Sequence, residues 1–184
     1  MLSLEAERLS QIIRGNARKF THLCDGVDEE TASSAPPGRW SPKEIVSHLC
    51  GPEGIGLLAT FEAIVDKDTP RLDIDAENSY FSEKRANMSF VELLAEFDAE
   101  YSRIADFLAG MSEEQLNRRA HIPMLKESPL GEYPTLADWA QGIGSFHLGM
   151  HIDHMKEILQ QLEAASAACG SSHSKHEESE RTFL

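Results

Sequence analysis

The first part of the chain places apolar side chains at alternating spacings of four and three residues. The repeat runs through Leu9, Ile13, Phe20 and Leu23, with Asn16 as its polar member. Such spacing puts these side chains on one face of an α-helix. It predicts an amphipathic helix over about residues 4–23, with this face buried against neighbouring elements.

A second helix is expected to begin at the sequence Ser41-Pro42-Lys43-Glu44. Serine at the N-cap can accept from the backbone amide three residues on, the glutamate can reach back, and proline suits the first helical position. The apolar pattern continues to about Val65, but Gly51-Pro52 interrupts it. Because proline lacks a backbone donor, a kink is expected there.

Two further helices come after a long connection. Residues 66–88 are polar and predict a crossover, and Ser89 with Glu92 forms another capping box. The third buried stripe comprises Phe90, Leu94, Phe97, Tyr101, Ile104 and Leu108. Thr135 is expected to cap a fourth helix that runs to about Leu162. Its predicted inner side comprises Leu136, Trp139, Ile143, Phe146, Met150 and Ile158.

These patterns together predict an all-α fold, a four-helix bundle over residues 1–163. From Ala164 onward small and charged residues show no apolar periodicity, which predicts a disordered tail over residues 164–184. A length of 184 residues suits a single domain.

The net charge of the chain limits the kinds of partner that it can bind. There are 31 acidic and 17 basic residues, a formal net charge of -14. This balance opposes binding of nucleic acid through a broad basic surface. No stretch has 18 consecutive apolar residues, and the first residues are acidic where a signal peptide is basic. We therefore expect a cytoplasmic protein with a small-molecule substrate, no nucleic-acid partner and no membrane partner.

Four histidines carry the candidate chemistry. His147, His151 and His154 are four and three residues apart, so they share one narrow stripe of the fourth helix. An i, i+4 histidine pair can converge on one metal ion, and His48 on the inward face of the second helix can supply a third nitrogen. Zinc suits these ligands best, although nickel, iron and manganese also accept imidazole. The alternative is a hydrogen-bonded histidine cluster in the core, or a proton switch.

Two strings then resemble a known family. Trp40 to Leu49 (WSPKEIVSHL) and Phe146 to His154 (FHLGMHIDH) are similar to the opening and closing helix motifs of the DinB and YfiT-like superfamily. The resemblance covers about residues 1–163. It implies an up-down-down-up bundle whose metal ligands are His48, His147 and His151, with His154 beside them as an alternative ligand. Glu53 matches an acidic position that often follows the first histidine.

The resemblance also bears on function. Three imidazoles leave an open coordination position, which is typical of a catalytic metal site. The family implies transfer reactions with low-molecular-weight thiols, isomerisation of thiol adducts, or hydrolysis. The leading hypothesis is a metal-dependent enzyme of the thiol-transferase type, with Glu53 or Asp153 as base or orienting group. The alternative is a non-catalytic stress-response or binding protein with a structural metal. Either form could assemble as a homodimer.

Overall fold

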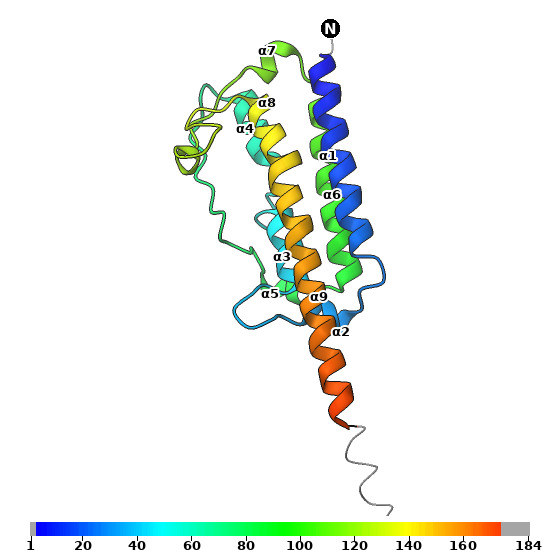
Figure 1. Cartoon of the computed structure of the whole chain (residues 1–184). Coiled ribbons are helices and arrows are strands. Elements are labelled where there is room, and N and C mark those ends of the chain that lie inside the picture. The colour runs from blue at the N-terminus through cyan, green and yellow to red at the C-terminus, as the bar shows by residue number, and fades with distance from the viewer. Residues whose placement is uncertain (1–2, 174–184) are drawn as a thin grey trace, which may run out of the picture.

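The computed structural model describes residues 3–173 and is built from helices (Figure 1). In chain order they are α1 (Leu4–Leu23), α2 (Glu29–Ser33), α3 (Pro42–Cys50), α4 (Leu58–Asp66), α5 (Glu83–Asn87), α6 (Phe90–Ala109), α7 (Glu113–Leu116), the 3-10 helix η1 (Pro123–Leu125), α8 (Leu136–Gln141), the π-helix η2 (Gly142–His147) and α9 (Leu148–His173). Over these residues the only β pairing is two isolated bridges, Arg71 with His121 and Arg119 with Thr135. The expected all-α fold is confirmed.

The long elements form a four-helix bundle with the expected order of directions. Helix α1 packs on α6 and α9, and α3 packs on the same two helices. In Figure 1 α1 and α9 descend, while α3 with α4 and α6 ascend, which is the up-down-down-up arrangement. Residues 67–82 run back along the length of the bundle, and this long connection makes α3 and α6 parallel (Figure 1).

Side chains cap the first turns of several helices. Reciprocal capping boxes join Ser41 to Glu44 at the start of α3 and Ser89 to Glu92 at the start of α6, as predicted. At the start of α8 Thr135 forms such a box with Asp138. Each box satisfies backbone N–H groups that have no partner inside the helix.

The second helix is broken rather than kinked. Helix α3 ends at Cys50, Gly51 has a φ of 75°, and the chain becomes helical again only at Leu58. No side chain of its own N-cap residue supports α4. Instead, the Glu100 carboxylate of α6 accepts from the Leu58 amide at 2.7 Å. A buried carboxylate from another helix therefore caps the restarted segment.

The fourth helix contains a π-helical turn that the sequence pattern did not reveal. In η2 each backbone bond spans five residues, so the turn takes in about one extra residue and rotates the remainder of the helix. Phe146 and Met150, expected on the inner side, are 75% and 48% exposed. That prediction was wrong, and the stripe continues instead from Ile143 to Leu148. The Asn16 side chain donates to the Gly144 carbonyl at 2.7 Å and so satisfies one acceptor of the widened turn.

Two smaller differences concern the edges of the predicted helices. In α6 Leu93 is fully buried and Leu94 is only partly buried, so the core stripe is shifted by one residue there. Helix α9 continues past Leu162 to His173, with the side chains of residues 163–168 exposed. The rest of the expected tail, residues 174–184, lies outside the described residues. Among the residues described, no helix is both long and apolar enough to cross a membrane.

Candidate metal centre

The bundle brings His48, His147 and His151 together from two helical elements far apart in the sequence. Each can offer one ring nitrogen, and these three nitrogens all lie within 4.8 Å of one another. Nε2 of His48 and Nε2 of His147 are 3.0 Å apart. Three nitrogens that bind one tetrahedral zinc ion at its usual bond length would lie roughly 3.3 Å apart. The cluster is therefore close to the size that a shared ion requires.

Burial keeps these rings neutral, which is the form that binds a metal. His48 and His151 are 7% and 4% exposed. Desolvation, followed by the neighbouring imidazoles, lowers the pKa of His147 to about 4 and that of His151 to about 2. Desolvation also lowers the pKa of His48. At neutral pH each ring can present a lone pair.

Several nitrogens of the cluster have no hydrogen-bond partner in the described part of the protein. They are Nδ1 of His147 and both Nδ1 and Nε2 of His151. Leaving a buried polar atom unsatisfied costs on the order of 1–3 kcal/mol. An ion that takes one nitrogen from each ring would offset part of that cost. The residues present therefore fit a divalent cation.

A backbone carbonyl sets the orientation of His48. Nδ1 of His48 donates to the carbonyl oxygen of Asn78 at 2.8 Å, which leaves Nε2 unprotonated and directed at the cluster. Such an outer hydrogen bond commonly fixes the tautomer and direction of a metal-binding histidine. Tyr80 stacks on the same ring, with centroids 6.3 Å apart and planes 13° apart. The polar connection before α5 therefore positions the His48 ring, a role that sequence reasoning missed.

His154 lies at the edge of the cluster. Its ring centroid is 5.7 Å from that of His151 and 6.4 Å from that of Trp40. It does not belong to the group of three whose ligand atoms lie within 4.8 Å. Among the described histidines, the structure therefore brings His48, His147 and His151 together and leaves His154 beside them.

The two carboxylates expected to assist catalysis are engaged elsewhere. The Glu53 carboxylate accepts from the Ser82 hydroxyl and lies 3.2 Å from Nζ of Lys84. Those two side chains lower the pKa of Glu53. Asp153 has a side chain that is 80% exposed and pairs with Lys156 at 3.2 Å. The break after Cys50 explains why Glu53 is engaged elsewhere. Gly51 and Pro52 take the chain out of the helix before it reaches Glu53.

A cavity of about 550 Å³ adjoins the histidines, and both His48 and His147 line it. Its walls come from the break after α3, from the connection around Leu72 to Ala76, and from α8 and η2. Trp139 and Phe146 line it as well. The sequence predicted both aromatic residues as core positions, and only the π-helical turn explains why Phe146 faces this space.

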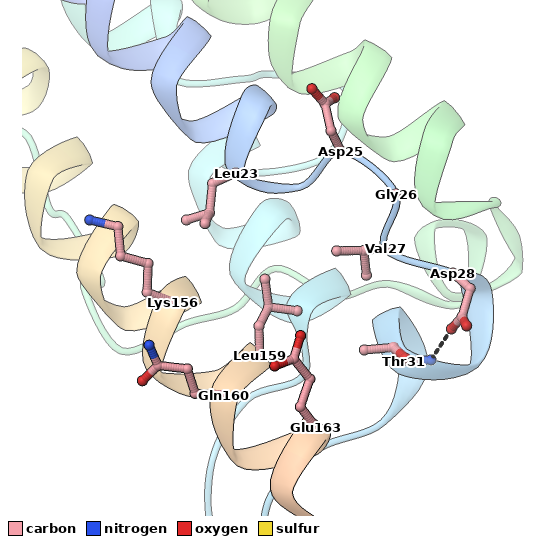
Figure 2. A pocket seen from close by; sticks show the side chains of 10 residues that line it. All are labelled: Leu23, Asp25, Gly26, Val27, Asp28, Thr31, Lys156, Leu159, Gln160 and Glu163. Carbon is pink, nitrogen blue, oxygen red and sulfur yellow. Dashed lines mark hydrogen bonds between the residues drawn. The ribbon is translucent and has the colours of Figure 1, made fainter. Parts of the chain in front are cut away.

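A second hollow, of about 370 Å³, lies at the C-terminal end of α1 (Figure 2). Its wall is formed by the end of α1, by the loop into α2 and by α9, and no member of the histidine cluster lines it. Asp28 caps α2 by accepting from the Thr31 amide at 2.8 Å (Figure 2). Asp25, Asp28, Lys156 and Glu163 are among its lining residues, but among the described residues its carboxylates belong to no group spaced to hold a metal ion.

With this geometry in place, comparison with known proteins identifies the family. The sequence model of the DinB superfamily matches residues 12–169. The chain belongs to the DinB superfamily. Among solved structures, YfiT from Bacillus subtilis matches with a TM-score of 0.70 and 18% sequence identity, over 89% of this chain and 91% of YfiT. YfiT is described as a probable metal-dependent hydrolase with an unusual four-helix bundle topology. At this identity the likeness shows the fold of this DinB protein. No curated protein matches the chain.

Proposed function

We propose that this DinB-superfamily protein is a divalent-metal-dependent enzyme of the thiol-transferase type. In this proposal His48, His147 and His151 hold the ion, most favourably zinc, and the adjoining cavity holds a small-molecule substrate. The observation that carries the proposal is the group of buried imidazole nitrogens without partners beside a cavity of about 550 Å³. A metal that only braced the bundle would need no such cavity.

When bound, a divalent cation lowers the pKa of a thiol or a water molecule that occupies its remaining coordination position. The chain contributes the rest. His48 and His147 face the cavity, the Asn78 carbonyl keeps His48 in the tautomer that binds a metal, and most of the cavity wall is apolar. Neither Glu53 nor Asp153 is placed to act as a base. A thiol has a pKa near 8.5 and ionises with less help than water, which favours thiol transfer.

Hydrolysis is the second candidate. The description of YfiT supports it, and Asp75 lines the same cavity as His48, where a carboxylate could accept a proton from water. A symmetric homodimer is compatible with either reaction.

The experiment compares the two reactions on one preparation. Untagged protein is analysed for bound metal, loaded with zinc, nickel, manganese or iron, and given 1-chloro-2,4-dinitrobenzene with cysteamine or glutathione, or a p-nitrophenyl ester. We expect metal-dependent thioether formation that His147→Ala abolishes and that the exposed-histidine control His22→Ala retains. Ester hydrolysis alone would favour the second candidate. Bound metal with neither reaction would support a structural or binding role.

A further inference from the structure

We propose that the cavity beside the histidines selects an uncharged, hydrophobic molecule that carries rings and discriminates against anions. This deepens the proposed function by naming the class of the acceptor substrate, and it rests on that function for the reaction itself. The binding claim stands on the walls of the cavity and is tested separately.

Exposed apolar side chains gather around this cavity. Among the described residues seven large apolar side chains are exposed: Leu4, Ile55, Val91, Met124, Tyr133, Phe146 and Met150. Four of these seven line this one cavity, namely Ile55, Met124, Phe146 and Met150. A contiguous apolar patch on a soluble protein commonly marks a binding site. Because these side chains surround a cavity, the patch continues into the interior.

The interior of the cavity offers a ligand few polar groups that lack a partner in the protein. Trp139 is 5% exposed, and its indole Nε1 donates to the Thr60 hydroxyl at 3.0 Å. That hydroxyl donates in turn to the Leu57 carbonyl at 2.8 Å. These groups are satisfied within the protein, so recognition rests on shape and apolar contact. The aromatic side chains of Trp139, Tyr80 and Phe146 all line the cavity and suit a ring system.

The charged side chains of the cavity wall also favour an uncharged ligand. Of the described residues that line the cavity, Asp73 and Asp75 are the charged ones, and none is Lys or Arg. The nearby cation of Arg71 pairs with Asp73 at 2.9 Å. Apart from an ion held by the histidines, a carboxylate, sulfonate or phosphate would find no cationic partner in this cavity to offset the hydration that it loses. An uncharged ligand has no such cost.

The volume fits this class of ligand. Pockets for small organic molecules commonly enclose about 300–1,000 Å³ and are lined mainly by apolar and aromatic side chains with few polar groups. The cavity of about 550 Å³ lies within that range and ends at His48 and His147. A bound ring system would therefore lie beside the ligand nitrogens of the metal site.

The test uses two fluorescent probes that share one ring system. N-phenyl-1-naphthylamine is uncharged, and 8-anilino-1-naphthalenesulfonate differs from it by a sulfonate. Fluorescence titrations are run on the full chain, both with chelator and loaded with zinc. In the chelated protein we expect saturable binding of the uncharged probe at one site per chain, with an affinity at least about tenfold above that of the sulfonate.

The matched variants locate the binding site. Phe146→Ala removes a cavity-lining side chain that is 75% exposed, so the fold should be retained. Val91→Ala removes an equally exposed apolar side chain of α6 that is absent from the cavity wall. We expect Phe146→Ala to weaken the uncharged probe by about fivefold and Val91→Ala to leave it unchanged.

Three results would overturn the inference. The first is sulfonate binding to the chelated protein as tight as that of the uncharged probe. The second is an equal loss in Val91→Ala and Phe146→Ala. The third is exclusion of both probes by a dimer, seen in sedimentation and dissociated by Phe146→Ala, which would show that a second copy of the chain covers the patch. If the probe binds as expected but no turnover appears with metal bound, the proposed reaction fails and the cavity assignment stands.

Discussion

Two buried polar clusters lie near the break after α3, and they differ in how many of their polar atoms have partners within the protein. One is the histidine triad, His48, His147 and His151. The other, here called the arginine-glutamate brace, consists of Arg85, Glu96 and Glu100. Members of both are almost fully buried, with Arg85 at 1%, Glu100 at 2% and His151 at 4% exposed.

The brace finds most of its partners inside the protein. The Arg85 guanidinium donates to the carbonyls of Ser47 and Gly51 and pairs with Glu96 at 2.5 Å. The Glu100 carboxylate accepts from Leu58 and pairs with Arg103. In the triad, by contrast, three buried nitrogens have no partner within the described residues. Within the described residues the brace leaves one buried nitrogen, Nε of Arg85, without a partner, whereas the triad leaves three, which a bound ligand could satisfy.

The largest expected effect is on the brace. Arg85→Met should lower the free energy of unfolding by about 3–5 kcal/mol, because it leaves Glu96 and two carbonyls without their buried cation. Urea denaturation measures the loss. Arg71→Met is the control, since the side chains of its ion pair with Asp73 are 58% and 72% exposed and the pair should be worth no more than about 1 kcal/mol. Equal small losses in both variants would show that the brace stabilises the fold no more than an exposed ion pair does.

The free energy of unfolding should depend on whether a metal ion is bound at the triad. Zinc at a free concentration of about 100 times its dissociation constant should raise the free energy of unfolding by about 2.7 kcal/mol. In His151→Ala this gain should disappear, and in His22→Ala, whose side chain is 87% exposed, it should persist. Thermal denaturation with and without chelator gives the readout. Persistence of the full gain in His151→Ala would exclude His151 as a ligand.

A pair of glycines isolates the contact between the break and the brace. Gly56 and Gly54 have nearly the same φ, 75° and 76°, so alanine is strained at both. A Cβ at Gly56 would lie 2.8 Å from Cδ of Glu100, whereas nothing lies within 4 Å of one at Gly54. We expect Gly56→Ala to cost about 1–2 kcal/mol more than Gly54→Ala in urea denaturation. Equal costs would mean that Glu100 moves aside freely.

The metal-free triad should make stability depend on pH. His147 has a folded pKa of about 4 and His151 one of about 2, and both lie below the ordinary value of 6.5. The unfolded chain therefore binds more protons below pH 6.5, so stability is full above that pH and falls toward these folded pKa values. Between about pH 6.5 and 5.5 we expect a loss of about 1 kcal/mol for each ring.

Denaturation of chelated protein across this range measures that loss. The double variant His147→Gln with His151→Gln should flatten the slope. An unchanged slope in the variant would assign the pH dependence to other groups.

The smallest expected effect concerns His154. Its ring lies at the edge of the triad, outside the group of closely spaced ligand atoms. His154→Ala should therefore weaken zinc binding by less than about threefold, well under about 1 kcal/mol. Isothermal titration beside His151→Ala checks this. A loss equal to that of His151→Ala would make His154 a ligand.

Several helix starts and the histidine cluster could be predicted from local sequence rules. Ser41 with Glu44 and Ser89 with Glu92 marked two helix starts, because capping depends on residues three positions apart. The spacing of His147 and His151, with His48 on an inward helix face, also led to a cluster that the structure does form. These features depend on periodicity within one helix, which a single sequence displays.

The rest depends on contacts between distant segments. Nothing around Asn78 marks its backbone carbonyl as the partner of His48, because the bond is set by the path of the connection and by no side chain. Arg85 lies in the polar segment that was expected to be a connection, although it enters the core beside Gly51. Regular periodicity also placed Phe146 and Met150 inside, since no residue in the sequence announces a π-helical turn.

That turn means that the fourth helix has two phases. The part before Gly142 and the part after His147 each have ordinary α-helical geometry, but they are offset by roughly one residue, or about 100°. Deleting a single residue between Gly142 and Phe146 would leave the spacing of His147 and His151 in the sequence untouched. It would also let the segment return to regular α-helical geometry, because the π-helical turn holds about one extra residue, so both histidines would keep their orientation relative to Trp139. A one-residue deletion at this place should therefore remove the π-helical turn and leave the histidine cluster on the same face of the helix.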